Sequence, residues 1–128
     1  MILLDTCALI WLNDDRSKFS KKVISLITEN LDSLFVSSIS FMEIGIKSKK
    51  EKLHIPSSLE EWSNRIIKIY SLNVIPVSKD IAVKAPMLPN LHKDPFDRII
   101  IATAIVNKMK IITADKAFKN YTQIKVIW

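Results

Sequence analysis

The sequence predicts an α/β fold in which helices cover both faces of a central, mainly parallel, five-stranded sheet. Short apolar runs recur along the chain, longer segments with helical spacing separate them, and no repeat or linker interrupts the alternation. Strands that are apolar throughout and alternate with helices are typical of a parallel sheet buried on both faces. With 128 residues the chain can bury about two-thirds of its unfolded surface, so we expect residues 1–128 to form a single domain.

Five strands and five helices are expected to alternate along the chain. The strands are the short apolar runs MILL (1–4), SLFVS (33–37), NVIPV (73–77), KIIT (110–113) and IKVIW (124–128). The helices are the segments with apolar residues at helical spacing, over residues 20–31, 39–51, 58–72, 95–108 and, more briefly, 79–85. In such sheets the functional crevice opens at the carboxyl ends of the strands.

The segment HKDPFDRIIIATA (92–104) contains a helix start that is rich in negative charge. Asp94 can accept hydrogen bonds from free helix N–H groups, and Pro95 suits the first helical position. Asp97 then lies in the first turn, where the helix dipole favours negative charge. Helix capping alone can therefore explain this motif, and a function for it needs further evidence.

The composition favours some classes of partner and excludes others. Nineteen Lys and Arg against thirteen Asp and Glu give a net charge of +6, which favours polyanions such as nucleic acid. Much of the excess lies in residues 17–22 and 47–52, which can equally be solvated helix ends. Gly45 is the single glycine, so glycine-rich dinucleotide and P-loop phosphate sites are excluded.

The cysteine content and the N-terminal segment indicate a cytoplasmic protein. Cys7 is the one cysteine and cannot form an internal disulfide, so we expect a small buried residue in a reducing compartment. The apolar N-terminus has no basic leader, contains Asp5 and lacks a small-residue cleavage site, unlike a signal peptide. No apolar run reaches membrane-spanning length.

Isolated acids follow the predicted strands. Asp5 follows residues 1–4, Glu43 is expected in the first turn of the helix after 33–37, and Asp115 lies just beyond 110–113. Capping can explain several of them, since Ser40 and Glu43 match a capping box and Asp115 can cap the segment KAFKN. Asp5 is different, because a carboxylate between ILL and CALIWL should be buried and needs a partner that no neighbouring Lys or Arg supplies.

These acids should converge if the strands are parallel, because the carboxyl ends of parallel strands share one edge of the sheet. Four or five carboxylates in one place repel one another, and a hard divalent cation such as Mg2+ or Mn2+ removes that cost. We therefore predict a metal site. His92 is the only histidine near these acids and is interpreted as a loop residue, so zinc is not expected.

The chain resembles the PIN-domain ribonucleases, and within them the VapC-type toxins of bacterial type II toxin–antitoxin pairs. The resemblance covers nearly the whole chain. The motifs that carry it are LLDTCALIWL, SSISFMEIGIK (37–47), HKDPFDRIIIATA (92–104), ITADKAF (112–118) and the terminal VIW. The chain departs from the family pattern after the IGIK helix, where relatives often have a glycine before KL and this chain reads KSKKEKL (47–53).

The resemblance implies a PIN-like three-layer fold with a Mg2+- or Mn2+-dependent endoribonuclease site. Asp5 and Asp97 would hold the metal directly, Glu43 would complete the site or orient the attacking water, and Asp115 would bind through water or a second ion. Asp94 is an extra acid of the DPFDR subgroup. Two further sets of residues are implied: Thr6 and Thr113 as the border of the pocket, and Lys93, Arg98 and the KSKK run as contacts to RNA phosphates.

The implied partners are an RNA substrate, a cognate antitoxin and a second copy of the chain in a homodimer, in the cytoplasm and without a membrane. We expect the apolar faces of residues 20–31 and 58–72 to contribute to an antitoxin or dimer contact. Three alternatives stay open: a PIN-like protein-binding scaffold with little catalysis, a housekeeping RNA-processing nuclease, and a phosphohydrolase of haloacid-dehalogenase type. The last normally needs an aspartate where this chain has Cys7.

Overall fold

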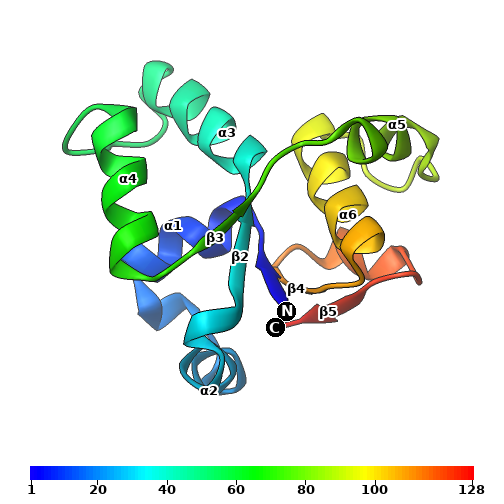
Figure 1. The fold of residues 1–128 in the computed structure, drawn as a ribbon, viewed down its shortest axis with the longest axis horizontal. Helices are drawn as coiled ribbons and strands as arrows, with labels where there is room; N and C mark the ends of the chain where they lie inside the picture. Colours follow the sequence, from blue (N-terminus) through cyan, green and yellow to red (C-terminus); the bar gives the residue numbers. More distant parts are fainter.

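The computed structural model describes residues 1–128 and contains one sheet of five strands, all parallel (Figure 1). The strand order is β3-β2-β1-β4-β5, so β1 lies at the centre. The strands are β1 (Ile2–Leu4), β2 (Leu34–Ser37), β3 (Asn73–Ile75), β4 (Lys110–Ile112) and β5 (Lys125–Ile127). The structure thus confirms the predicted α/β class, and each strand lies within its predicted segment.

The helices that cover the sheet are α1 (Thr6–Asp14), α2 (Lys21–Glu29), α3 (Ser38–Lys49), α4 (Leu59–Ile69), α5 (Lys79–Met87) and α6 (Pro95–Asn107). Three short 3-10 helices complete the structure: η1 (Arg16–Lys18), η2 (Leu31–Ser33) and η3 (Lys116–Asn120). The five predicted helices are all present, with ends that differ by up to three residues. None of the helices has the length and apolar character needed to cross a membrane.

Helix α1 was not predicted. Its segment TCALIWLND follows β1 after a single residue, and the two together form one nearly continuous apolar run. Ala8, Leu9 and Leu12 are fully buried, and of the other helix residues only Cys7 and Asp14 are exposed, so the sequence shows no clear polar face. Without that face, the 3.6-residue period that identifies an amphipathic helix is lost.

The core consists of two clusters on opposite faces of the sheet. Ile2 and Leu4 of β1 face one cluster and Leu3 faces the other, as expected from the alternation of side chains along a strand. Helices α1, α2, α3 and α4 pack on the first face, and α5 and α6 cover the second (Figure 1). The expected three-layer arrangement of helices, sheet and helices is confirmed.

Strand β3 corrects the expectation that all strands are buried. It lies at the edge of the sheet and pairs only with β2. Asn73 and Val74 are exposed, and Ile75 is half-buried. An edge strand has a neighbouring strand on one side only, and few side chains cover β3. The apolar sequence of this run therefore predicted more burial than β3 has.

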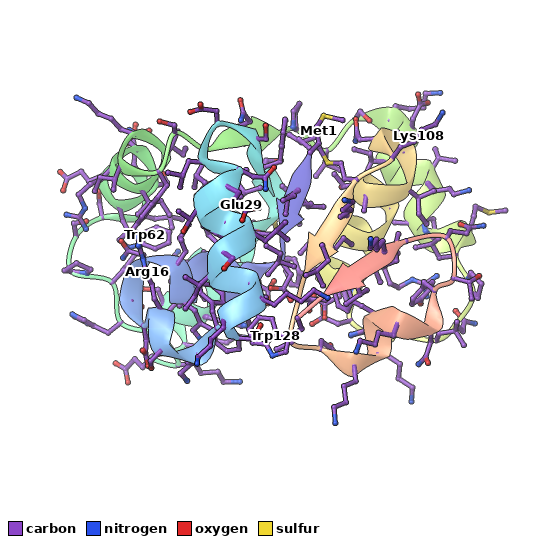
Figure 2. All side chains as sticks on the ribbon, turned by 90° about the horizontal axis from the view of Figure 1, so that it is seen from below. Met1, Arg16, Glu29, Trp62, Lys108 and Trp128 are labelled. Atoms are coloured by element: carbon purple, nitrogen blue, oxygen red, sulfur yellow. The ribbon has the colours of Figure 1, made fainter.

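Aromatic side chains pack the C-terminus against the first layer of helices. The Trp128 ring lies 5.5 Å from the Trp11 ring of α1 and 5.8 Å from the Phe19 ring, measured between centroids. Figure 2 shows Trp128 beside α1 and α2 at the end of β5. Aromatic pairs at these distances add to the stability gained from buried area. The terminal VIW therefore anchors the edge strand β5.

Both ends of α3 differ from a simple reading of the sequence. The N-cap is Ser37, whose Oγ accepts a hydrogen bond from the Ile39 N–H, so the predicted capping box of Ser40 and Glu43 is wrong. At the other end Lys52 N donates to Lys47 O, and Glu51 N donates to Ser48 O. These two bonds form a Schellman motif, and Glu51 takes the left-handed conformation with a φ of 58°.

We predict that Glu51→Gly stabilises the protein by about 0.5 to 1 kcal/mol, because glycine adopts this conformation without the steric cost of a Cβ atom. This is the position before KL at which the sequence departs from the family pattern noted above. The measurement is urea unfolding of both proteins. As a control, Lys50→Gly at the neighbouring C-cap, where φ is −86°, should not stabilise. A loss of stability in Glu51→Gly would contradict the argument.

Candidate functional site

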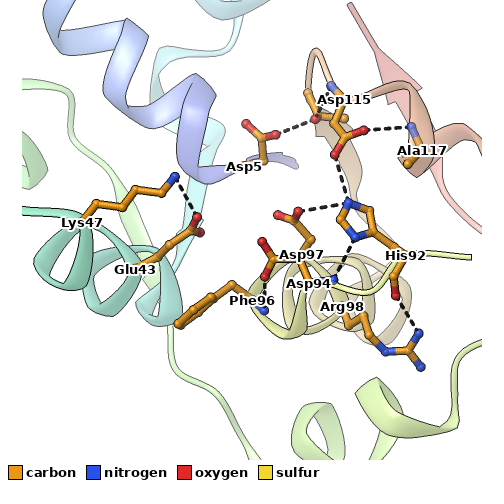
Figure 3. Close-up of polar contacts among 11 residues, drawn as sticks. Asp5, Glu43, Lys47, His92, Asp94, Phe96, Asp97, Arg98, Asp115 and Ala117 are labelled. Carbon is orange, nitrogen blue, oxygen red and sulfur yellow. Dashed lines mark hydrogen bonds and ion pairs between the residues drawn. The ribbon is translucent and has the colours of Figure 1, made fainter. Parts of the chain in front are cut away.

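The predicted acids meet in one pocket at the carboxyl edge of the sheet (Figure 3). The pocket has a volume of about 170 Å3. It is lined by Asp5, Thr6, Cys7, Trp11, Glu43, Lys47, Asp94, Asp97, Ala114 and Asp115. The acids come from four separate parts of the fold: the end of β1, helix α3, the start of α6 and the loop after β4. The parallel sheet therefore gathers residues that are up to 110 positions apart in the sequence.

Asp5 is buried, with only 5% of its surface exposed, and its partners come from the fold rather than from neighbouring cations. Its Oδ1 accepts a hydrogen bond of 2.8 Å from the Ala8 N–H, so Asp5 is the N-cap of α1. Its Oδ2 accepts a hydrogen bond from the Thr113 hydroxyl. Burial nevertheless raises the pKa of Asp5 to about 6, and the charges of Glu43 and Asp115 add to this.

Glu43 lies in the second turn of α3 rather than in the first, and its side chain is buried in the pocket. Its Oε2 forms a 3.0 Å ion pair with the Lys47 Nζ one turn later. Burial would lower the pKa of Lys47, but the Glu43 carboxylate raises it. The other oxygen of Glu43, Oε1, is buried and has no hydrogen-bond partner. A buried carboxylate oxygen without a partner is costly, so it indicates a missing donor or cation.

The two aspartates of the DPFD motif have different roles at the start of α6. Asp94 is the N-cap, as predicted, and its Oδ1 accepts a hydrogen bond of 2.9 Å from the Phe96 N–H. Asp97 lies in the first turn. Its burial raises the pKa of the carboxyl to about 7, and the charge of Asp94 adds to the shift. The environment of Asp97 therefore differs from that of a simple first-turn acid, whose ionised form the helix dipole would favour.

Asp115 and Asp97 both contact His92, which was interpreted from the sequence only as a loop residue. His92 Nε2 bonds Asp115 Oδ2 at 2.9 Å and lies 3.1 Å from Asp97 Oδ2 (Figure 3). Asp115 also caps η3 through a 2.9 Å bond from the Ala117 N–H to its Oδ1. Although partial burial would raise it, the bonds from His92 and Ala117 lower the pKa of Asp115. The one sequence signal for His92 was its place two residues before the DPFD acids.

The two predicted border threonines are buried and join elements of the site. Thr113 donates to Asp5 Oδ2 and accepts a 3.0 Å hydrogen bond from the Asp115 N–H. It thereby orients two of the acids at once. Thr6 donates a 3.0 Å hydrogen bond to the Ser40 hydroxyl, which ties the start of α1 to α3.

Cys7 differs from its prediction, because it is exposed rather than buried. It is the second residue of α1 and lines the acidic pocket instead of packing in the core. Partial desolvation and the charge of Asp5 raise the pKa of the thiol to about 11. The thiol therefore stays protonated at neutral pH, and this environment does not activate it as a nucleophile.

The residues predicted to contact RNA phosphates differ in what their side chains contact in the structure. The four N–H groups of the terminal nitrogens of Arg98 point to backbone carbonyls, namely Pro89 and His92 from NH1 and Pro86 and Leu88 from NH2. Arg98 thus holds the loop before α6, and the structure does not support a phosphate contact for it. Lys93 is exposed and lines a different cavity with His92 and Arg98, whereas Lys47 of the KSKK run is the one cation that lines the acidic pocket.

The donor set fits a hard divalent cation. Every acid in the pocket offers carboxylate oxygen, and Glu43 Oε1 is both buried and free of partners. Asp97 and Asp115 each offer a carboxylate oxygen, and these two oxygens lie within 4.8 Å of each other. Oxygen donors of this kind are the ligands that Mg2+ and Mn2+ take in proteins, together with water and substrate phosphates.

Comparison with known proteins identifies the family. The PIN domain family matches residues 2–123. Ribonuclease VapC22 of Mycobacterium tuberculosis is 25% identical over 121 residues, which cover 94% of this chain and 91% of the relative. Two similar solved structures are VapBC2 of Rickettsia felis bound to a promoter DNA fragment and VapBC-1 of nontypeable Haemophilus influenzae.

The structural matches extend over nearly complete chains. The Rickettsia structure has a TM-score of 0.71 at 17% identity and covers 99% of this chain and 98% of its own. The Haemophilus structure has a TM-score of 0.71 at 20% identity, with 99% and 97% covered. At these identities the likeness shows the fold. With a parallel five-stranded sheet, a pocket of acids at its carboxyl edge and a family match over almost all of its length, the chain belongs to the PIN-domain family.

Proposed function

We propose that the protein is a Mg2+- or Mn2+-dependent endoribonuclease that hydrolyses RNA phosphodiester bonds and acts as the toxin of a toxin–antitoxin pair. The observation that carries the proposal is the convergence of five acids in one pocket, with the buried Glu43 Oε1 left without a partner. A relative of nearly equal length is a ribonuclease, VapC22, and similar structures are of toxin–antitoxin complexes. The relative and the similar structures both support the proposed function.

The four family acids divide the work of this site. Asp5 and Asp97 would hold the cation directly, and Asp115 would complete the site through water or a second ion. Glu43 completes the site or orients the attacking water with its free Oε1. A bound Mg2+ or Mn2+ supplies charge neutralisation at the phosphate and lowers the pKa of water. Thr113 holds Asp5 by a hydrogen bond, Asp94 caps the helix that carries Asp97, and Thr6 ties α1 to α3 through Ser40.

Basic side chains offset the repulsion between an acidic pocket and RNA. Lys47 lines the pocket, and Lys93 is exposed next to His92 in the sequence, so we propose both as contacts to substrate phosphates. The rest of the net charge of +6 favours the approach of RNA through sequence-independent attraction. Because phosphate contacts carry no sequence information, the choice of cleavage site rests on other features of the RNA.

The complete acid set argues against the alternative of a scaffold with little catalysis, which would not need Glu43, Asp97 and Asp115 beside a buried Asp5. A housekeeping RNA-processing nuclease would share the chemistry and differ only in its partner. A haloacid-dehalogenase-type phosphohydrolase is not favoured, because the position that needs a second acid is Cys7, a protonated thiol that lines the pocket.

The proposed assembly follows from the toxin reading. We propose that residues 1–128 act as one domain in the cytoplasm, where a cognate antitoxin binds the protein and a second copy forms a homodimer. Helices α2 and α4 cover the same face of the sheet and expose part of their apolar surface. Ile24 of α2 is 44% exposed and Ile69 of α4 is 59% exposed. We place the antitoxin contact on this surface of α2 and α4.

The first prediction concerns metal dependence. Cleavage of a single-stranded RNA by the purified protein should require Mg2+ or Mn2+ and stop with chelator. Asp5→Asn should reduce cleavage by more than the roughly tenfold to hundredfold that the loss of an outer hydrogen-bond partner costs, because it removes a direct ligand. Asparagine is also a good N-cap, so α1 should stay intact.

The matched control is Asp15→Asn, which changes a capping aspartate of η1 that lies outside the pocket. It should cleave RNA as the wild type does. Undiminished cleavage by wild type in chelator would refute the metal mechanism, and equal losses in both variants would point to a general effect on folding.

A second prediction separates a metal ligand from a helix cap at Asp97. If Asp97 only favoured the helix dipole, Asp97→Asn would cost about 0.3 to 1 kcal/mol with or without metal. Because burial and Asp94 raise the pKa of Asp97 to about 7, neutralising it should leave the metal-free protein at least as stable as wild type. Millimolar Mg2+ should then stabilise wild type and have little effect on the variant.

The measurement is thermal unfolding in chelator and in Mg2+. Asp80→Asn is the control, since Asp80 also lies in the first turn of a helix, α5, but outside the pocket. It should respond to Mg2+ as wild type does. A loss of similar size in both conditions for Asp97→Asn would leave the DPFD segment as a helix start only.

A third prediction concerns the antitoxin contact. Ile24→Ala and Ile69→Ala should each weaken association with the cognate antitoxin by roughly fivefold, as expected for partly exposed apolar residues at an interface. Neither should change metal affinity. Val83→Ala is the control, because Val83 is 57% exposed on α5, at the opposite face of the sheet. Binding measured by calorimetry that is the same for all three variants would exclude this surface.

A further inference from the structure

His92 connects two acids that come from separate parts of the fold. Its Nε2 bonds Asp115 Oδ2 at 2.9 Å and lies 3.1 Å from Asp97 Oδ2. Asp115 belongs to the loop after β4 and Asp97 to α6, so no backbone hydrogen bond fixes the distance between the two carboxylates. Figure 3 shows the imidazole between them, with its other nitrogen turned toward the backbone of Asp94.

The hydrogen-bond network assigns the proton on the ring. The Asp94 N–H donates to His92 Nδ1 over 3.2 Å, so Nδ1 must have a free lone pair. The ring proton then lies on Nε2, where it faces the two carboxylate oxygens. A nitrogen that carries this proton donates a hydrogen bond and has no lone pair for a metal. The geometry therefore describes His92 as a donor to the acids and not as a ligand.

The surrounding structure holds the ring in this orientation. Arg98 donates to the carbonyl oxygen of His92 at 3.1 Å and, through its other N–H groups, to two more carbonyls of the same loop and to that of Pro86 at the end of α5. The Tyr121 hydroxyl bonds the Pro89 carbonyl at 2.8 Å, and the His92 ring packs edge-on against Phe118 at 5.7 Å. Only 13% of the His92 side chain is exposed. This is the environment of a fixed side chain.

We infer that His92 is a positioning residue for the metal site. Its Nε2–H holds Asp97 and Asp115 close together, so that both carboxylates can bind the same cation. This inference deepens the proposed function and rests on it. Without the donor, two carboxylates on separate elements would repel each other and move apart. Outer hydrogen-bond partners of this kind typically change metal affinity by about tenfold to a hundredfold.

The experiment compares two variants that each keep one half of the imidazole. His92→Gln retains a donor near the position of Nε2 and loses the Nδ1 contact. His92→Asn retains an acceptor near Nδ1, which can still receive the Asp94 N–H, and loses the contact with both carboxylates. Mn2+ affinity is measured by calorimetry on the purified full chain. We expect His92→Gln to stay within about threefold of wild type and His92→Asn to bind at least about tenfold more weakly.

The control is His54→Asn, because His54 is the other histidine of the chain and is exposed in the connection between α3 and α4. It should bind Mn2+ as wild type does. If His92 only stabilised its loop, the order would be reversed, with His92→Asn tolerated and His92→Gln impaired. That reversed order, or wild-type affinity in both variants, would overturn the inference.

A spectroscopic readout tests the bridge without metal binding or activity. Imidazole proton–nitrogen correlation spectra of 15N-labelled protein should show the Nε2–H tautomer for His92 in chelator and again after addition of Mg2+. An Nδ1–H tautomer in chelator, or loss of the Nε2–H signature on adding Mg2+, would overturn the inference. If wild type neither binds Mn2+ nor cleaves RNA, the proposed function falls as well; normal wild-type binding with an unaffected His92→Asn overturns the positioning role alone.

Discussion

Repulsion among the acids of one small pocket is the constraint on which the rest of this site depends. Five carboxyl groups line a pocket of about 170 Å3, and Lys47 is the only cation among the lining residues. Burial raises the pKa of Asp5 to about 6 and that of Asp97 to about 7, so protons compete for the pocket near neutral pH. Such a cluster is stable only where hydrogen bonds, Lys47 and a bound cation offset the repulsion.

Capping and metal binding turn out to be compatible roles of the same side chains. Asp5, Asp94 and Asp115 each use Oδ1 to cap a helix, so the free N–H groups of α1, α6 and η3 fix these carboxylates. The second oxygen of Asp5 meets Thr113, and that of Asp115 meets His92. Helix N-termini stabilise negative charge, which favours ionised carboxylates at the edge where the substrate would approach.

The elements of the fold were largely predictable, and the two errors have different causes. Short apolar runs such as SLFVS and KIIT alternate with helical segments along the chain, and that alternation is a local property which predicts a parallel sheet. The period of an amphipathic segment reports burial on one face, so α1, which is covered on most sides, gave no clear signal. For β3 the apolar sequence suggested burial, but its position at the sheet edge left Val74 exposed.

The sequence by itself determined the kinds of chemistry available: oxygen-rich acids after the strands, no glycine-rich phosphate loop and no disulfide. The order β3-β2-β1-β4-β5 places β1 between β2 and β4, and only this tertiary arrangement brings their carboxyl ends together. It also decided that Arg98 holds backbone carbonyls, that Cys7 faces solvent and that His92 joins Asp97 to Asp115. These outcomes depend on how loops and separate elements pack together in space, which residue spacing along one chain does not encode.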